Sequence, residues 1–442
     1  MSVSINGSTG ISGVNGSASN PAIKGGDADT GIHFGSDTAA ITTGGTDKVS
    51  IDSSGDTTFS GKVKTSKVEN ANTSNGGVEI DTDGHVQVDG RQLPTAGPQA
   101  NRNILFNGEG LVIQRGTQTG ISSNSHVYGT DRWALEATPA STGTFTFGAT
   151  TSVLPPGGGF QAAHRILCTT ASTGLAANAV LIFQQRLEGV DMQRIKKGTA
   201  NAEPLVLSFY VRSSKTGTYI VEFQDANNGR NIQRSYTITT ADTYQYVELT
   251  IPGDTTNALS NNTGHGFTIR FWLVAGSVFQ SGTLQTTWGN TVNANRVVGQ
   301  VNLADTVNAD WYVTGIQLEL GTKATPYEQK TFRDELSRCQ RYFQLVPFTN
   351  GVVATATQVH ANYSLMTEMR AAPSVSQQGI FDVNDNSVNA TQSGVNVISY
   401  GDGKIKFVQI GSFTGLTTHR PCFMRFSGDP SNNNLLTLNA EL

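Results

Sequence analysis

Two glutamates in predicted β-strands are the residues whose type and spacing come closest to catalytic chemistry. Glu188 follows Gln185 and precedes a glycine, and Glu319 follows Gln317 and stands two residues before another glycine. Retaining and inverting glycosidases use such a pair of carboxyl groups, one as general acid and one as nucleophile or base. Both glutamates, however, fall inside strand patterns, where a polar side chain on the outer face or at a strand end is ordinary. We therefore expect structural roles for them, no catalytic residue, and a chain that is not an enzyme.

Other patterns for catalysis and metal binding are absent or incomplete. The sequence has no GxSxG, HExxH or GxxxxGK motif. Asp27 with Asp29, and Asp81 with Asp83, resemble the start of a calcium loop, but position 12 of the second loop is Gln92, where a bidentate glutamate is needed. These aspartates are therefore expected in turns, and no metal site or cofactor is predicted.

Candidate ligand-binding residues are aromatic and polar side chains near turns. Sugar recognition combines an exposed aromatic platform with a few placed polar groups. Trp288 lies among Thr, Gly and Asn outside a strand pattern, so it is the tryptophan expected to be exposed; the alternative is a loop anchor packed on the domain. Further candidates lie near turns of the last domain, where ordinary loop residues are the alternative: His360, Asn362, Tyr363, His419 and Arg420.

The composition favours a mainly β chain in which these residues sit on strands and turns. Of 442 residues, 14% are charged, 37% are hydrophobic and 49 are glycines, a profile typical of short strands and polar turns. In residues 1–93, short apolar pairs such as Ile32/Phe34 and Val49/Ile51 alternate with turn signals. Each strand buries too few large side chains to offset the cost of ordering it. We predict a trimeric β-shaft or a segment that becomes ordered on docking here, with a disordered linker as the alternative.

The rest of the chain divides into a linker, a β-sandwich, a connecting helix and a tip. Two prolines and a glycine mark a linker at 94–100. Residues 101–328 hold all four tryptophans and many strand patterns, which predicts a jelly-roll-like sandwich with Trp133, Trp272 and Trp311 in its core. Strand patterns return in 344–442 and predict a third, smaller β domain at the C-terminus, the tip.

A helix is predicted at 329–343. Thr331 and Asp334 form a capping box at its start. The apolar residues that follow at steps of 4, 3 and 4 would share one helix face: Phe332, Leu336, Cys339 and Phe343. This face either packs on its own domain or lines a threefold axis with two other copies, and the spacing favours the axis.

Charge and cysteine usage exclude several partners. The formal net charge is −4, and no Lys/Arg cluster suits a phosphate backbone, so no nucleic acid is expected; residues 194–197 (RIKK) are predicted to form a solvated turn. Cys168, Cys339 and Cys422 form no CxxC pair, which predicts free, buried thiols in a protein made in a reducing cytosol. No basic, apolar leader or run of about 18 apolar residues appears, so no membrane insertion is expected.

Several segments, taken together and in order, resemble many bacteriophage tail-fibre and tail-appendage proteins. They are ILFNGEG at 104–110, QRG at 114–116, DRW at 131–133, TGIQLELG at 314–321, ATPYE at 324–328, DELSRCQRYF at 334–343, MRAAP at 369–373 and LNAEL at 438–442. The resemblance covers about residues 101–442. Its motifs look structural, so no functional residue comes with it.

The resemblance implies a homotrimeric tail fibre of the virion. Its N-terminal region, 1–93, would dock on the virion by binding a tail protein or an adaptor near the portal. Its C-terminal tip, 344–442, would be the receptor-binding domain and would bind a host surface polysaccharide or outer-membrane protein. The predicted sandwich also resembles carbohydrate-binding modules, a likeness of fold class that does not assign a ligand. The alternatives are a tailspike that depolymerises surface polysaccharide and a fibre attached to the capsid.

Overall fold

The computed structural model describes most of the chain, which divides into two compact units, Met1–Arg91 and Gln92–Leu442. The described residues are 4–6, 10–12, 15–64, 67–69, 77–80, 86–88, 91–92, 100–138, 143–172, 174–346, 349–362, 365–378, 380–385, 389–392, 397–400, 407–411, 413–427 and 435–442. The predicted linker at 94–100 lies outside them, apart from its last residue.

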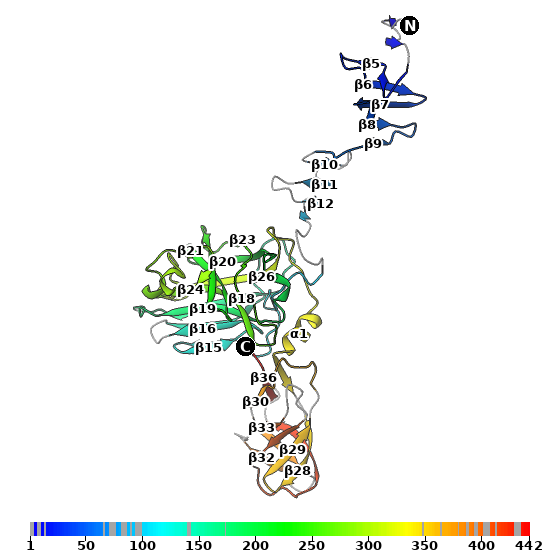
Figure 1. Ribbon diagram of the computed structural model, residues 1–442. Coiled ribbons are helices and arrows are strands. Elements are labelled where there is room, and N and C mark those ends of the chain that lie inside the picture. Colours follow the sequence, from blue (N-terminus) through cyan, green and yellow to red (C-terminus); the bar gives the residue numbers. More distant parts are fainter. Residues whose placement is uncertain are drawn as a thin grey trace. The chain divides into compact units, whose positions relative to one another are not determined.

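The first unit consists of short antiparallel strands (Figure 1). They are β1 (Ser4–Asn6), β2 (Gly10–Ser12), β3 (Gly16–Ser17), β4 (Asn20–Pro21), β5 (Ile23–Lys24), β6 (Gly31–Gly35), β7 (Thr38–Thr43), β8 (Thr46–Ile51), β9 (Thr57–Phe59), β10 (Lys67–Glu69), β11 (Gly77–Ile80) and β12 (Val86–Val88), with β13 (Arg91–Gln92) at the unit boundary. The predicted apolar pairs all lie on strands, Ile32/Phe34 on β6 and Val49/Ile51 on β8.

One row of apolar residues crosses the five-stranded sheet β5-β6-β7-β8-β9. We name Ile23, Ile32, Ile41, Val49 and Phe59 the apolar ladder, because each is paired in register with the next. Four of its members are exposed and Val49 is half-buried. Side chains two residues apart share one face of a strand, so Phe34 and Ile51, both exposed, extend this face.

The second unit is built on a β-sandwich. One sheet has the order β14-β17-β18-β26-β20-β23 and the other β15-β16-β19-β24-β21-β22-β25. The strands are β14 (Gln118–Ile121), β15 (Ser125–Tyr128), β16 (Ala134–Thr138), β17 (Thr144–Thr150), β18 (Ala163–Thr170), β19 (Val180–Glu188), β20 (Leu205–Ser213), β21 (Gly217–Asp225), β22 (Arg230–Ile238), β23 (Gln245–Ile251), β24 (His265–Ala275), β25 (Gly289–Asn290) and β26 (Asp310–Leu320). Four 3₁₀ turns interrupt the connections: η1 (Gln193–Ile195), η2 (Ser277–Phe279), η3 (Asn293–Asn295) and η4 (Leu303–Asp305).

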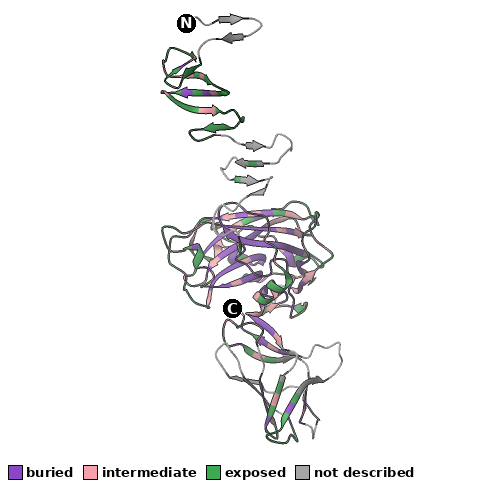
Figure 2. Ribbon diagram, turned by 90° about the vertical axis from the view of Figure 1, so that its right-hand side faces the viewer, coloured by how far each residue is buried: buried purple, intermediate pink, exposed green. Residues whose placement is uncertain are grey.

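Aromatic side chains from the facing sheets fill the core between them. Phe147 on β17 contacts Phe183 on β19 with ring centroids 5.6 Å apart, and Trp311 on β26 lies 5.6 Å from Phe271 on β24. Trp133 stacks on Phe183 at 4.5 Å. The buried residues of the sandwich form its interior in Figure 2. The mainly β fold and the predicted core tryptophans are confirmed, and so are the three free, buried cysteines.

The α-helix α1 (Phe332–Gln340) follows the sandwich and is the one α-helix among the described residues. The predicted capping box is confirmed: the Asp334 amide donates to Thr331 Oγ1 at 3.2 Å, and Thr331 Oγ1 donates to Asp334 Oδ2 at 2.7 Å. The predicted C-terminal boundary is wrong. The helix ends at Gln340, and Phe343 begins a strand, because pairing with a strand far along the chain replaces helical hydrogen bonds there.

Residues after α1 form two sheets, of order β27-β36-β30 and β32-β31-β35-β28-β29-β34-β33. The strands are β27 (Phe343–Val346), β28 (Thr349–Thr355), β29 (Gln358–Asn362), β30 (Ser374–Gln378), β31 (Ile380–Asn384), β32 (Asn389–Gln392), β33 (Val397–Tyr400), β34 (Phe407–Ile410), β35 (Pro421–Ser427) and β36 (Leu435–Asn439). A separate small core includes Val353, Val359, Val383 and Leu438. Strand β36 pairs with β27, so the chain returns beside the strand by which it left α1.

Candidate functional site

Four of the segments that resemble phage appendage proteins meet at one place in the second unit. We name this place the motif junction and define it by Gln114, Arg115, Asp131, Arg132, Tyr342, Phe343 and Glu441. These residues come from three regions of the sequence more than 90 residues apart. Their side chains form one connected set of hydrogen bonds, ion pairs and ring contacts.

Two arginines connect the three regions of the motif junction. Arg115 lies over the Phe343 ring at 3.6 Å and donates to Glu441 at 3.2 Å. Arg132, which is fully buried, lies over the Tyr342 ring at 3.4 Å and also pairs with Glu441. A guanidinium that stacks on a ring and binds a carboxylate uses both its face and its edge. These motifs therefore have a structural role: they connect the segment before the sandwich, the end of α1 and the residues after β36.

The two glutamates considered for catalysis are engaged in this framework. Glu188 at the end of β19 is buried, receives two hydrogen bonds from Arg341 at 2.8 and 2.9 Å, and accepts one from the Tyr342 hydroxyl at 2.6 Å. Glu319 on β26 is buried and accepts from the Thr325 amide at 2.8 Å. Each carboxylate thus has protein partners in place of solvent or substrate.

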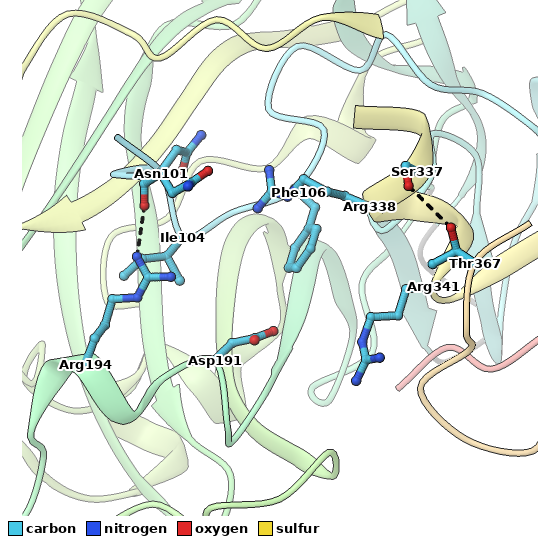
Figure 3. A pocket seen from close by; sticks show the side chains of 10 residues that line it. Asn101, Ile104, Phe106, Asp191, Arg194, Ser337, Arg338, Arg341 and Thr367 are labelled. Atoms are coloured by element: carbon cyan, nitrogen blue, oxygen red, sulfur yellow. Dashed lines mark hydrogen bonds between the residues drawn. The ribbon is translucent and has the colours of Figure 1, made fainter. Parts of the chain in front are cut away.

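An open cleft of about 510 Å³ lies beside the motif junction (Figure 3). We name it the arginine cleft. Four stretches of chain line it: the segment before the sandwich, the turn after β19, the C-terminal half of α1 and the segment after β29. The lining residues are Asn101, Asn103, Ile104, Phe106, Asp191, Arg194, Ser337, Arg338, Arg341 and Thr367. Its volume is within the range of small-molecule sites.

Three arginines are the positively charged residues that line the cleft. Arg338 lies over the Phe106 ring at 4.3 Å and is about one quarter exposed. Arg194 is exposed and donates through Nη1 to the Asn101 carbonyl at 2.9 Å. Arg341, one third exposed, is held by Glu188 behind the cleft wall. Guanidinium groups provide planar forks of N–H donors that suit carboxylates, phosphates and sugar hydroxyls.

Asp191 is the one carboxyl group among the lining residues. Figure 3 shows it pointing into the cleft, between the Arg194 and Arg341 side chains. Burial raises its pKa, and the nearby Glu188 charge acts in the same direction, while Arg341, Arg194 and Arg132 partly offset both. A carboxyl group with a raised pKa in a cleft is typical of functional sites.

Trp288 makes the contacts expected of a loop anchor, and its role in sugar binding stays a prediction. Its ring is half-buried, packs 6.3 Å from Phe267 between centroids, and donates its indole N–H to the Pro252 carbonyl at 2.8 Å. Lys197 approaches the ring at 6.0 Å. Trp288 does not line the arginine cleft.

Two of the candidates in the last domain, His360 and Arg420, lie on either side of strand β28. His360 on β29 is half-buried and lies opposite Val352 of β28, while the Arg420 carbonyl accepts from the Val353 amide at 2.9 Å on the other side. His419 and Arg420 are exposed, and His419 has a φ of 67°. Asn362 ends β29, and Tyr363 lies outside the described residues. Their role in receptor binding stays a prediction.

The four residues proposed for a trimer axis do not share one exposed face. Cys339 and Phe343 are buried within their own chain, Leu336 is half-buried and Phe332 is exposed. Burial of the first two follows from the motif junction, where Phe343 lies under Arg115. An axis along α1 would therefore be contacted chiefly by Phe332.

Lys197 corrects the prediction of a solvated turn at 194–197. Its ammonium group is buried and lies 2.6 Å from an Asp225 oxygen and 3.0 Å from an Asp254 oxygen. It also donates to the carbonyls of Thr256 and Asn257, at 2.7 Å each. The partners come from β21 and the segment after β23, so no local pattern announces them. Arg194 and Lys196 are exposed as predicted.

Two further searches concern the described part of the chain alone. Within it, no group of three or more His, Cys, Asp or Glu side chains is arranged to hold a metal ion. None of its helices has the length and apolar character needed to span a membrane.

No family model matches the sequence, and no curated protein matches it. Among solved structures, the enzymatically active domain of bacteriophage CBA120 tailspike protein 4 is similar over 50% of this chain, with 15% identity and a TM-score of 0.27; the chain spans 21% of that chain's length. TmCBM61 in complex with β-1,4-galactotriose is similar over 50% of this chain and all of its own, with 10% identity and a TM-score of 0.22. An exo-β-agarase is similar over 65% of this chain and 40% of its own, with 12% identity and a TM-score of 0.24.

These comparisons correct one prediction. Two of the similar structures are a tailspike domain with enzymatic activity and an agarase, which contradicts the expectation that the chain is not an enzyme. The exclusion of catalysis is therefore withdrawn.

Proposed function

We propose that this chain is a structural protein of a bacteriophage virion, a homotrimeric tail fibre or related appendage, which adsorbs the virion to its host by binding a surface glycan in the arginine cleft. The observation that carries the proposal is the cleft itself. It is open, about 510 Å³ in volume, and presents guanidinium, amide, hydroxyl and carboxyl groups beside an aromatic ring. Polar groups in this density suit the many hydroxyls of a sugar.

The assignment to a virion rests on the motifs. Eight segments from 104 to 442 follow the order seen in phage appendage proteins, and many of their residues contact one another at the motif junction. Attachment to the tail and attachment to the capsid agree equally with these motifs. Labelling the protein on intact virions and imaging them separates the two, and absence from the particle would end the proposal.

The apolar ladder supports the homotrimer. Its side chains cover one face of a five-stranded sheet in the first unit, and most of them are exposed in the single chain. A sheet must cover its apolar face to be stable in water. Copies of the same face, packed around a common axis, would bury each other.

A second candidate is a depolymerase that cleaves the glycan bound in the same cleft. Asp191 favours it, because a carboxyl group with a raised pKa is suited to act as a general acid. One assay compares the two functions. The purified full chain is incubated with polysaccharide from host cells, and both bound polymer and new reducing ends are measured. Binding without new reducing ends supports adhesion, and new reducing ends support the depolymerase. If the chain shows neither binding nor new ends, both proposals lose their support.

A further inference from the structure

We propose that the arginine cleft recognises an anionic sugar residue, whose carboxylate or sulfate group is held by Arg338 and Arg194. The inference rests on the proposed function, glycan binding, and names the class of glycan. Nothing in the resemblance or the comparisons assigns this cleft a ligand.

Arg338 carries donors that its own chain uses weakly. Its hydrogen bonds to Glu335 and to the Leu105 carbonyl measure 3.4 and 3.3 Å, longer than the usual 2.7–3.2 Å range. The Phe106 ring supports the guanidinium plane from one side at 4.3 Å. Stacking fixes the plane and leaves the N–H edge available, which is the arrangement that binds a planar anion in bidentate fashion.

Arg194 supplies a second cation from the turn after β19. It is exposed, and its one described hydrogen bond goes from Nη1 to the Asn101 carbonyl. That bond ties the arginine to the segment before the sandwich, so its remaining donors stay near the cleft. Two guanidinium groups on different elements thus approach one cavity.

The arginines of the cleft differ in how far their charge is neutralised by a carboxylate of the same chain. Arg341 is neutralised by Glu188, which is fully buried, so this arginine is chiefly structural. Arg194 and Arg338 then face the opening with Asp191 as the one carboxyl group among the lining residues. An anion entering the cleft meets two guanidinium forks and one acid.

The neutral groups of the lining favour a saccharide as the carrier of the anion. Asn101 and Ser337 are exposed, and Thr367 lies 3.3 Å from Ser337 between hydroxyl oxygens. Amides and hydroxyls both donate and accept, as sugar hydroxyls do. A small inorganic anion would leave most of these groups without a role.

The experiment measures binding of the full chain to three oligosaccharides of equal length. One carries uronic acid, one is the same sugar with its carboxyl groups reduced to alcohols, and one is sulfated. The chain is expected to bind at least one anionic sugar, at least tenfold more tightly than the reduced one, with affinity falling as salt increases. The uronate and sulfate arms identify the anion.

Variants locate the site. Arg338→Gln and Arg194→Gln should each reduce affinity for the anionic sugar about tenfold, since each removes a charge-assisted contact. Arg338→Lys should keep part of it. Arg333→Gln is the matched control, because Arg333 is exposed on the same helix and does not line the cleft. Unfolding midpoints confirm that the variants are folded. Because Arg194 is exposed, its substitution should disturb the fold less than that of Arg338.

Two results overturn the inference. Equal affinity for the anionic and reduced sugars would leave glycan binding intact and remove the anionic class. An equal loss in the Arg333→Gln control would remove the cleft as the site. Failure to bind any sugar of the panel or host polysaccharide would instead count against the proposed function.

Discussion

Arg341 and Glu188 form a two-pronged ion pair, with Nε to Oε1 at 2.8 Å and Nη2 to Oε2 at 2.9 Å. The pair joins the residue after α1 to the end of β19, 153 positions earlier in the chain. Arg341 lines the arginine cleft, and Glu188 behind it also accepts from Tyr342 of the motif junction, so the pair connects the two. One interaction thus holds both the framework and the candidate site.

Arg341→Met should destabilise the second unit by about 1–3 kcal/mol, because it leaves the fully buried Glu188 carboxylate with the Tyr342 hydroxyl as its remaining described partner. The lower part of this range allows for Arg341 being one third exposed to water. Denaturant unfolding measures the loss. Arg333→Met, on the exposed face of the same helix, should change stability little, and an equal loss there would contradict the assignment.

Lys197→Met should be among the most damaging substitutions in the sandwich. It leaves the buried Asp225 carboxylate without its cation and Asp254 with Arg230 alone, for an expected loss of about 3–5 kcal/mol. The neighbouring Lys196→Met is the control. Lys196 is half exposed and pairs with Glu203 at the surface, so its loss should be at most about 1 kcal/mol. Similar unfolding midpoints for the two variants would show that the buried cation has no special role.

Binding of an anionic sugar should strengthen as pH falls through the raised pKa of Asp191. Above this pKa the carboxylate is ionised and repels the ligand, and below it the group is neutral. The charges that face Asp191 are those of Glu188, Arg341, Arg194 and Arg132. Asp191→Asn should bind more tightly at neutral pH and lose this pH dependence.

The measurement for Asp191 uses the sulfated oligosaccharide, because its own charge does not titrate in this range. Titration calorimetry at several pH values gives the affinity. The control is Asp242→Asn, since Asp242 is exposed and does not line the cleft. If the affinity of wild type and Asp191→Asn changed with pH in the same way, a group other than Asp191 would be responsible for the pH dependence.

Trp288→Phe separates the anchor role from the sugar platform. The substitution keeps a ring against Phe267 and removes the hydrogen bond to the Pro252 carbonyl. We expect a loss of about 1 kcal/mol in unfolding free energy and unchanged binding to host polysaccharide. A folded variant with reduced binding would restore Trp288 as a contact residue.

Ile41→Lys should disrupt the trimer if the apolar ladder is its interface. Ile41 is the middle member of the ladder and is exposed in the single chain. A lysine there would place a charge among apolar side chains of the other copies. Thr58→Lys is the control, since Thr58 is exposed on the opposite face of the neighbouring Phe59. Light scattering should give a trimer mass for wild type and control and a monomer for Ile41→Lys. A monomeric wild type would remove the proposal.

The sequence predicted those features of the fold that depend on interactions between residues close together in the chain. The strand predicted from Ile32 and Phe34 and the capping box at Thr331 depend on neighbours within a few residues. The arginine cleft does not, because Phe106, Asp191 and Arg338 meet only after the sandwich and α1 pack together. Lys197 looked solvated for the same reason: its acidic partners are 28 and 57 positions away.

Phe343 shows where a periodic pattern misleads. Its spacing from Cys339 continues the helical repeat, yet it pairs with Asn439 in a sheet. The side chains of Tyr342 and Phe343 contact Arg132 and Arg115, and those ring contacts are possible because the chain leaves the helix after Gln340. Helical spacing gives no information about a partner strand almost 100 residues away.

The pairing of β27 with β36 makes the last domain exchangeable. Val346 and Leu436 are partners in register, so the chain enters and leaves the tip at neighbouring points. A segment whose ends lie close together is the kind of insertion that a fold tolerates best. Recombination at these two points would replace one tip with another while α1 and the sandwich keep their contacts with each other. A chimera with a foreign tip inserted there should retain the unfolding transition of the sandwich. Loss of that transition would show that the native tip stabilises the sandwich and α1.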